Sequence, residues 1–432
     1  MTMSSTSSQV KGGRLPWSGL LALSCAAFTA VMTELLPAGL LPAMAPPLGV
    51  AESRIGFLVT AYAAASFLAA IPVTAALRGL PRRPVLCGAL LGFAASDALV
   101  ALSSSYPLTL AARLLAGATG GTLWAMLVGY AARMVPAGRR GRAIAIVLAG
   151  ITLALSLGVP AGTALAGAVG WRAAFGTLAV LAVALVGWVR LCVPGFPGEP
   201  PHVRVPLTRV ARRPGIRPVL SVTLFLLLGH QVMYTYVAPF AAHAGYGRTG
   251  ALLAVFGTAT VAGIWLTGAL IDRCPRTTLL VALALFTAVL PTLGLLARAH
   301  VLLVGAVALW GVAFGGAPTL IQSALVDASG PAEAEVATSL QTTVYNAGIA
   351  AGSLLGGLTL DARGPGALPW TALPPAVLAT AVVAAARRYA FPARRHGVAP
   401  EAKAPAGPVP VAAARAAGDH AVRRSMGHGE GQ

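Results

Sequence analysis

Charged residues are scarce in this sequence, which excludes an ordinary soluble protein. Only 10% of the 432 residues are charged, whereas 57% are hydrophobic. A soluble domain carries roughly 25% charged residues because its surface faces water. Runs of about 20 apolar residues, long enough to cross a bilayer core of about 30 Å, recur along the chain. The composition therefore predicts an integral membrane protein.

Cysteine is also scarce, and the motifs of common catalytic sites are missing. The four cysteines, Cys25, Cys87, Cys192 and Cys274, lie in different segments without a CxxC pair, so neither a disulfide framework nor a zinc site is expected. The sequence has no GxxxxGK[ST] loop for ATP, and no HExxH or GxSxG motif. We therefore expect no enzyme, no catalytic residue, no metal and no cofactor. A membrane-embedded enzyme is the non-transport alternative that these absences disfavour.

Acidic residues are few, with 12 Asp and Glu against 31 Lys and Arg, which gives a net charge of +19. The basic residues cluster between the hydrophobic runs, and no basic module with interleaved aromatic residues is present. We therefore expect no nucleic-acid partner. Such clusters are typical of loops that stay on the cytoplasmic side of a membrane.

Twelve membrane spans are predicted from the hydrophobic runs. They cover residues 17–43, 54–77, 84–102, 107–132, 142–168, 171–193, 217–241, 248–271, 277–297, 300–326, 334–360 and 369–390. We expect an all-α membrane protein made of two pseudo-symmetric six-helix bundles. Its predicted parts are a cytoplasmic N-terminal tail (1–16), an N-terminal bundle (17–193), a cytoplasmic linker (194–216), a C-terminal bundle (217–391) and a disordered cytoplasmic tail (392–432).

The basic residues predict the orientation of the chain. Of the 31, 25 lie in the two tails and in the connections that follow spans two, four, six, eight and ten, and Arg113 lies inside a span. The other side has only Arg54, Arg172, Arg248, Arg298 and Arg363. Both termini are therefore expected in the cytoplasm. The connection between spans ten and eleven breaks the trend, because it carries acidic residues and no basic one.

The two halves repeat at an offset of 194 residues. This shift superposes four glycine pairs in equivalent spans: Gly117 on Gly311, Gly121 on Gly315, Gly158 on Gly352 and Gly162 on Gly356. It also places the Pro-Arg turn at 81–82 on the one at 275–276. Parallel repeats of six spans form one large class of transporters. The repeat favours alternating access around a central substrate cavity over a channel or a sensor.

Five motifs carry a family resemblance. They are TELLPAGLLP at 33–42, LAARLLAG at 110–117, GVPAG at 158–162, GWR at 170–172, and Asn346-Ala347-Gly348 with the glycines that follow it. In this order they resemble the major facilitator superfamily, in particular the twelve-helix drug:proton antiporter branch that includes arabinose-efflux-like permeases. The resemblance implies close helix packing at Gly158, Pro160, Gly162, Gly352 and Gly356, where small residues let helices approach.

One loop departs from the pattern of this family, which reads Gly-x-x-x-Asp-Arg-x-Gly-Arg between spans two and three. Residues 268–276 match it nearly, with Asp272, Arg273 and Arg276. Residues 74–82 carry Arg78 where the acid belongs, and end in Arg82. These five residues are the candidates for gating, and a cytoplasmic gate would depend on Asp272 and Arg273 or on different contacts.

Ionisable residues inside a membrane are costly and are therefore functional candidates. The first half has three, Glu34, Asp97 and Arg113. Asp97 and Arg113 each lie eight residues from Ser105, so antiparallel helices place them at matching depth, and a purely structural ion pair is one interpretation. Glu34 is expected at a similar depth. Two acids beside one permanent cation leave one desolvated carboxyl that could carry a proton.

The second half offers aromatic and amide side chains at helical spacing. The candidate cavity residues are His230, Gln231, Tyr234, Trp310, Phe314, Gln322 and Asn346. The functional interpretation is an aromatic wall with amides that orient a substrate, with His230 as a second proton carrier. Ordinary packing of the aromatic residues is the alternative.

These features favour a secondary active transporter that exports a small hydrophobic molecule, such as a drug or secondary metabolite, in exchange for protons. Export of a sugar or another polar metabolite is the alternative, which the few polar groups of spans one, four, seven and ten disfavour. The expected partners are the small-molecule substrate, protons and the lipid bilayer. We expect a monomer in the bacterial inner membrane, with multiple spans and both termini cytoplasmic.

The charge distribution makes the orientation testable. A reporter fused after Gly198 is expected in the cytoplasm, and one inserted near Ser104 is expected outside. Alkaline phosphatase and green fluorescent protein fusions measure this, since each is active on only one side. A phosphatase signal at Gly198 would contradict the orientation.

Overall fold

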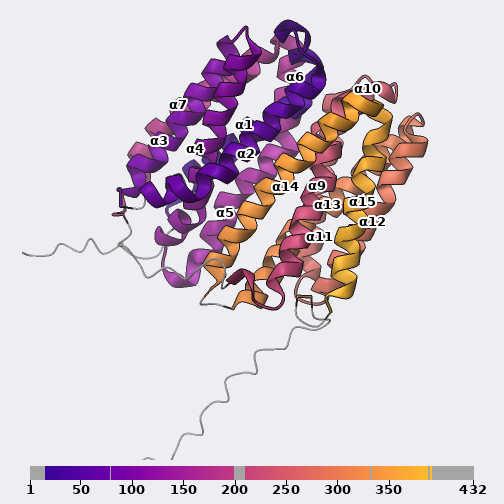
Figure 1. Ribbon diagram of the computed structural model, residues 1–432. Helices are drawn as coiled ribbons and strands as arrows, with labels where there is room; N and C mark the ends of the chain where they lie inside the picture. The colour runs from indigo at the N-terminus through magenta and orange to yellow at the C-terminus, as the bar shows by residue number, and fades with distance from the viewer. Residues whose placement is uncertain (1–14, 78, 199–209, 331–332, 388–389, 392–432) are drawn as a thin grey trace, which may run out of the picture. The chain divides into compact units, whose positions relative to one another are not determined.

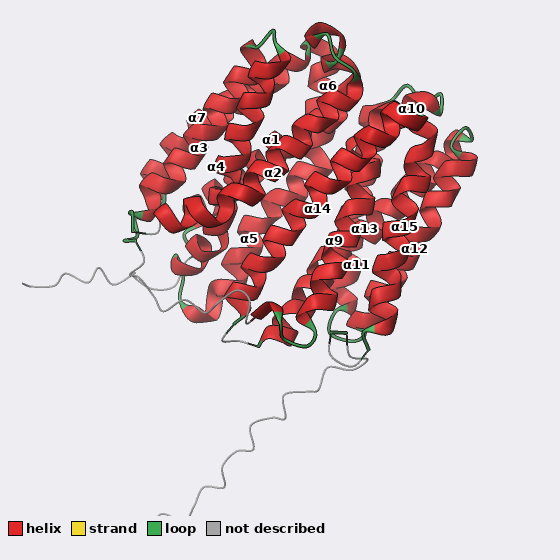
Figure 2. Ribbon diagram, in the orientation of Figure 1, coloured by secondary structure: helices red, strands yellow, loops and turns green. Residues whose placement is uncertain are grey.

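The computed structural model describes residues 15–77, 79–198, 210–330, 333–387 and 390–391, which form helices and short connections without any strand (Figure 2). Two expected segments, the N-terminal tail and the tail after 391, lie almost entirely outside these residues, as do Arg78 and the middle of the linker. The described helices follow the twelve predicted spans (Figure 1).

The first half contains six spans. They are α1 (Trp17–Met44), α2 (Glu52–Leu77), α3 (Arg82–Leu102), α4 (Tyr106–Arg133), the continuous segment α5 (Arg140–Leu153), η3 (Ala154–Gly158) and α6 (Val159–Val169), and α7 (Trp171–Cys192). The η3 segment is a π-helical turn just before Pro160. Proline has no N–H to donate and its ring crowds the preceding turn, which explains the wider turn here.

The second half repeats this order. Its spans are α9 (Ile216–Thr235) with α10 (Val237–His243), α11 (Thr249–Leu270), α12 (Pro275–Leu296), α13 (His300–Ser329), α14 (Ala334–Arg363), and α15 (Leu368–Ala385). Ten of the spans among the described residues are long and apolar enough to cross a membrane by hydropathy. The other two, α2 and α14, have no charged residue over 55–77 and 336–360 and pack along each other between the halves.

Because the spans alternate in direction, their connections fall at two ends of the bundle. We call the end at which α1 begins the basic end; it holds the connections near residues 80, 136, 200, 272 and 331. The opposite end holds those near residues 48, 104, 170, 246, 298 and 365. The basic end takes its name from the arginine-rich connections that the chain gathers there.

The internal repeat is visible in the packing as well as in the sequence. A Cβ on Gly117 of α4 would overlap the carbonyl oxygen of Tyr62 of α2, and a Cβ on Gly311 of α13 would overlap that of Phe256 of α11. These are equivalent contacts in the two halves, because Gly311 lies 194 residues after Gly117 and Phe256 lies 194 residues after Tyr62. Without side chains at these positions the two helices approach backbone to backbone.

Two equivalent turns also match. Gly170 joins α6 to α7 with φ of 95°, and Gly364 follows α14 with φ of 78°. Both positions need the left-handed backbone that glycine adopts without strain, so each reverses the chain in one residue. They again lie 194 residues apart.

An arginine caps the last span of each half. Arg83 donates from Nη1 to the carbonyl oxygens of Arg190 (3.3 Å) and Val193 (3.5 Å) at the end of α7. Arg276 donates from Nη2 to those of Val383 (3.3 Å) and Ala384 (3.0 Å) at the end of α15. A cation at a helix C-terminus satisfies carbonyls that lack an intrahelical partner and opposes the helix dipole.

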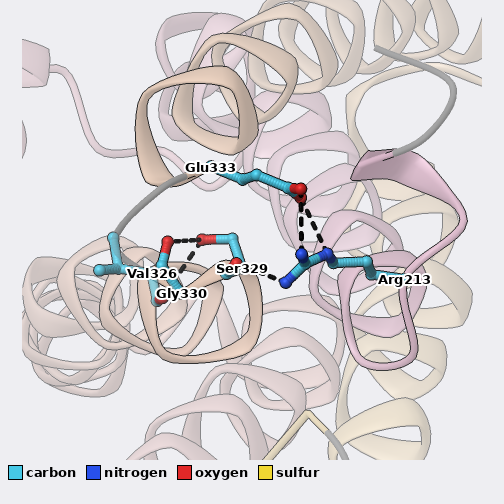
Figure 3. Close-up of polar contacts among 5 residues, drawn as sticks. All are labelled: Arg213, Val326, Ser329, Gly330 and Glu333. Atoms are coloured by element: carbon cyan, nitrogen blue, oxygen red, sulfur yellow. Dashed lines mark hydrogen bonds and ion pairs between the residues drawn. The ribbon is translucent and has the colours of Figure 1, made fainter. Parts of the chain in front are cut away.

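The acidic connection between spans ten and eleven has a partner in the linker. Arg213 donates from Nη2 to Glu333 Oε1 (3.0 Å), places Nε 2.8 Å from Oε2, and donates from Nη1 to the Ser329 carbonyl oxygen (2.8 Å) (Figure 3). This bidentate pair fastens the end of the linker to the turn between α13 and α14. It explains why an acid stands in a connection on the basic side.

The buried apolar residues form two clusters that divide the bundle unevenly. One fills the first half near its basic end, with members such as Leu23, Leu86 and Leu127. The other runs through the whole second half and continues into the opposite end of the first half, through residues such as Leu41 and Phe175. The two halves therefore share a core at the opposite end.

The glycine contact of α4 with α2 predicts a stability effect. Gly117→Ala should lower the free energy of unfolding by about 1–3 kcal/mol, because the added methyl group overlaps a backbone oxygen that cannot move aside. The melting temperature in detergent measures this. Gly129→Ala is the control, since nothing in the described chain lies within 4 Å of its Cβ position; equal melting temperatures for the two variants would contradict the packing argument.

Candidate functional site

A buried arginine forms the centre of the first half. The Arg113 side chain of α4 is 1% exposed, and its guanidinium donates to three main-chain oxygens. Nη1 donates to Thr33, Nη2 to Glu34 (3.0 Å) and Nε to Leu58 (3.4 Å). One side chain of α4 thus holds α1 and α2 together.

The sequence of α1 explains why these oxygens are available. In an α-helix the carbonyl of Thr33 would accept from the N–H of residue 37, but residue 37 is a proline inside α1. The Thr33 oxygen is therefore left for Arg113. The TELLP segment can therefore bind a guanidinium, because its proline frees a carbonyl oxygen that would be hydrogen-bonded within an unbroken helix.

Asp97 of α3 completes the contact from a third helix. Its Oδ2 accepts from the Thr33 hydroxyl (2.8 Å), while its Oδ1 is buried without a hydrogen-bond partner among the described residues. The structure thus places Thr33 between the acid and the arginine. It was not predicted from the sequence, because threonine is common in membrane spans and carries no charge.

Tyr62 of α2 lies against the same guanidinium. The Arg113 Cζ lies 4.8 Å from the ring centroid, a cation–π distance, and the ring is fully buried. A Cβ on Gly120 of α4 would overlap the Tyr62 hydroxyl, so glycine at 120 makes room for the ring. The hydroxyl has no hydrogen-bond partner within the described part of the chain. Tyr62 was also missed by sequence reasoning.

Glu34 lies within reach of the same charges and of the other half. The carboxylate interacts electrostatically with Arg113 and with Tyr62, and across the interface with Tyr345 of α14. Its side chain is 9% exposed. The structure therefore brings together Glu34, Asp97 and Arg113, which the sequence had singled out.

The aromatic candidates of the second half form one packed cluster. The His230 ring stacks on Phe314 (centroids 3.6 Å apart) and on Tyr234 (5.2 Å), and its Nδ1 accepts from Trp310 Nε1 (3.2 Å). A neutral histidine that accepts at Nδ1 carries its proton at Nε2. Phe256, which the sequence reasoning did not include, lies 4.9 Å from Trp310. These rings are at most 8% exposed, so they bury one another.

The amide candidates are spread over three helices. Gln231 is buried on α9 next to the Gly352 position of α14, and its Nε2 has no hydrogen-bond partner among the described residues. Asn346 is buried on α14 and donates to the Thr342 carbonyl oxygen of its own helix (3.0 Å). Gln322 is exposed on α13, two turns beyond the buried Phe314.

The candidate gating residues lie at the basic end. Arg82 begins α3, while Asp272 and Arg273 are exposed in the turn between α11 and α12. Arg276 is the cap of α15 described above, and Arg78 lies outside the described residues. What these residues do during gating stays a prediction.

The candidate packing residues lie in close helix contacts. A Cβ on Gly158 would overlap Met32 and Phe28 of α1, and one on Gly162 would overlap Leu36. In the second half, a Cβ on Gly352 would lie 2.6 Å from the Leu228 carbonyl oxygen of α9, and one on Gly356 would lie 2.7 Å from the Tyr236 ring. Pro160 stands in the first turn of α6.

Comparison with known proteins decides the family. The sequence profile of the Major Facilitator Superfamily matches residues 23–273 and 241–424. The chain belongs to this superfamily. It is a multi-pass membrane transporter and not an enzyme, as the missing catalytic motifs predicted.

Curated relatives include efflux pumps. The purine ribonucleoside efflux pump NepI of Escherichia coli (strain K12) is 28% identical over 352 residues, which cover 80% of this chain and 88% of the relative. The NepI protein of Escherichia coli O1:K1 is 29% identical over 355 residues with the same coverage.

Solved structures of this superfamily share the fold. The human organic anion transporter MFSD10 superposes with a TM-score of 0.65 at 18% identity, over 85% of this chain and 98% of the other. A bacterial homolog of the human lysosomal transporter Spinster, in an inward-facing and occupied conformation, also gives 0.65 at 17% identity, over 87% and 98%.

The Arg113 contacts predict that charge alone is insufficient at this position. Arg113→Lys keeps the positive charge but replaces a planar fork by a single ammonium, which cannot reach three carbonyl oxygens on two helices. We expect the variant to lose about 2 kcal/mol or more of stability. Thermal unfolding in detergent measures this, with Arg298→Lys at an exposed turn as the control. A melting temperature for Arg113→Lys equal to that of the wild type would show that the carbonyl contacts contribute little.

Proposed function

We propose that this transporter exports a small molecule in exchange for protons, and that Glu34 carries the proton. The observation that supports this is a charge count in one buried site. Glu34 and Asp97 are two acids near a single arginine, Arg113, whose hydrogen bonds described above all go to main-chain carbonyl oxygens. With both acids ionised the site would carry a net negative charge in the membrane, which is costly. Binding one proton removes that charge.

Glu34 is the better candidate of the two acids. Asp97 is held on one side by the Thr33 hydroxyl and is fully buried inside the first half. Glu34 interacts with Tyr345 of the second half, so its surroundings change whenever the halves move apart. A proton carrier needs such a change, because it must bind the proton on one side of the membrane and release it on the other.

One contact at the opposite end of the bundle bears on the proposed alternating access. Tyr236, the non-helical residue between α9 and α10, donates from its hydroxyl to the Ser353 carbonyl oxygen of α14 (2.9 Å). A Cβ on Gly56 of α2 or Gly357 of α14 would overlap the same side chain. Tyr236 of the second half thus packs against α2 of the first half at the opposite end, and this contact supports an inward-facing state in the predicted orientation.

Two substrate classes can be compared directly. The packed aromatic cluster and the apolar spans favour a small hydrophobic molecule. The polar alternative gains a specific candidate from the relatives, whose names describe export of purine ribonucleosides. The buried amide of Gln231, which has an unpartnered Nε2 among the described residues, is a group that could recognise a polar base.

The test combines an energy source with a matched pair of variants. Export from loaded cells, or uptake into inverted vesicles, measured with either substrate class, should stop on addition of a protonophore and survive ATP depletion. Glu34→Gln should abolish proton-driven export while the protein stays folded and inserted, because the amide cannot carry a proton. Asp97→Asn should be milder, since the amide oxygen of the new side chain can still accept from the Thr33 hydroxyl.

Two outcomes would contradict this assignment. Substrate-induced proton release that persists in Glu34→Gln would exclude Glu34 as the carrier and favour Asp97 or His230. Transport that continues unchanged without a gradient would indicate facilitated diffusion. Substrate exchange between equal concentrations on both sides is the control, because a transporter that lost only proton coupling still performs it.

A further inference from the structure

We infer that the lipid-facing cleft between α3 and α7 binds an anionic phospholipid at the basic end of the bundle. The cleft has a volume of about 370 Å³ and is lined by Arg83, Pro84, Cys87, Gly88, Leu91 and Arg190. Arg83 and Arg190, at the basic end of their helices, are its two charged lining residues, and the other four are apolar or small. None of the candidate site residues discussed above lines this cleft.

The charge of the cleft is fixed by the fold. Arg83 is held at the mouth because its Nη1 donates to the Arg190 and Val193 carbonyl oxygens. A guanidinium has five N–H donors, so this bond does not exhaust its capacity. The Arg190 side chain is exposed beside it. Two adjacent guanidinium groups match the oxygens of a phosphate, which arginine binds in bidentate geometry.

The shape of the cleft favours a lipid over a free anion. Along α3 the lining runs from Arg83 to Leu91, eight residues or about 12 Å towards the middle of the membrane. A phosphate ion would fill the mouth alone. A lipid would place its headgroup on the arginines and an acyl chain over Gly88 and Leu91, both of which are exposed. Basic pockets between helices on the cytoplasmic side are where anionic headgroups bind.

The same chemistry recurs at the start of the second half. A cleft of about 450 Å³ is lined by Arg212 and Arg217 with Ala211, Leu220 and Ser221 at the beginning of α9. It lies at the same end of the bundle, again with two arginines beside small and apolar residues. We therefore expect two bound anionic lipids, of which one occupies the cleft between α3 and α7.

Native mass spectrometry of the full-length protein in detergent tests this with two lipids of equal chain length, phosphatidylglycerol and phosphatidylcholine. The wild type should retain phosphatidylglycerol preferentially, with up to two bound. Arg190→Gln should weaken one of these two by about fivefold, the effect of one basic residue near an anionic headgroup. The Arg190 carbonyl, which Arg83 needs, is unchanged in this variant.

Gly88→Phe tests the apolar part of the cleft separately. No described atom outside its own helical turn lies within 4 Å of the Cβ position, and Gly88 itself lines the cleft, so the ring is expected to occupy the space of the acyl chain. It should reduce the maximum from two bound phosphatidylglycerols to one. Gly176→Phe, on α7 towards the opposite end and equally open, and Arg298→Gln are the matched controls, and both should bind as the wild type does.

Three outcomes would overturn the proposal. Equal retention of the two lipids would show that charge does not select the occupant. If Arg190→Gln and Gly88→Phe retained phosphatidylglycerol as their control variants do, the lipid would bind elsewhere. Displacement of the lipid by millimolar inorganic phosphate would show a site for a free anion.

Discussion

The structure of the first half depends on one guanidinium that is buried inside the bundle. Arg113 lies inside the bundle, where an unsolvated charge is tolerated only if polar groups surround it. Membrane helices offer few such groups, since their carbonyl oxygens are used within each helix. Pro37 releases one of them, and the Tyr62 ring adds a π face. The arginine therefore ties α1, α2 and α4 into a unit that cannot separate without exposing the charge.

This rigid unit constrains how the transporter can move. Alternating access needs contacts that break and re-form at little cost, and the Arg113 contacts are unsuited to that because they would leave a charge in apolar surroundings. The contacts between the halves are of another kind. The Tyr236 hydroxyl donates within the second half, to the Ser353 carbonyl oxygen, and across the interface its side chain only packs against Gly56 of α2, so separating the two leaves no buried charge behind. The proposed motion is therefore expected at the interface of the halves.

Sequence reasoning predicted the spans, the repeat and the clustering of Glu34, Asp97 and Arg113, because hydropathy, spacing and helix direction fix depth. It did not predict Thr33 or Tyr62, since neither is charged and their roles arise from neighbours on other helices. The proline at 37 was a signal that could have located the acceptor for Arg113. The depth of a residue in the membrane can be counted along its helix, whereas the direction in which its side chain points depends on how the helix packs. For this reason the sequence did not predict that Trp310 and Phe314 are buried while Gln322 is exposed.

The same distinction explains the acidic connection between spans ten and eleven. Charge counting treats each loop alone, and on that basis Glu333 contradicts the basic character of its side. The fold places it against Arg213 of the linker, so the local pair is neutral and the excess of basic charge remains on the other loops (Figure 3). The linker is consequently fastened to the second half at its far end. The proposed movement between the halves leaves this contact intact, because it joins the end of the linker to the second half alone.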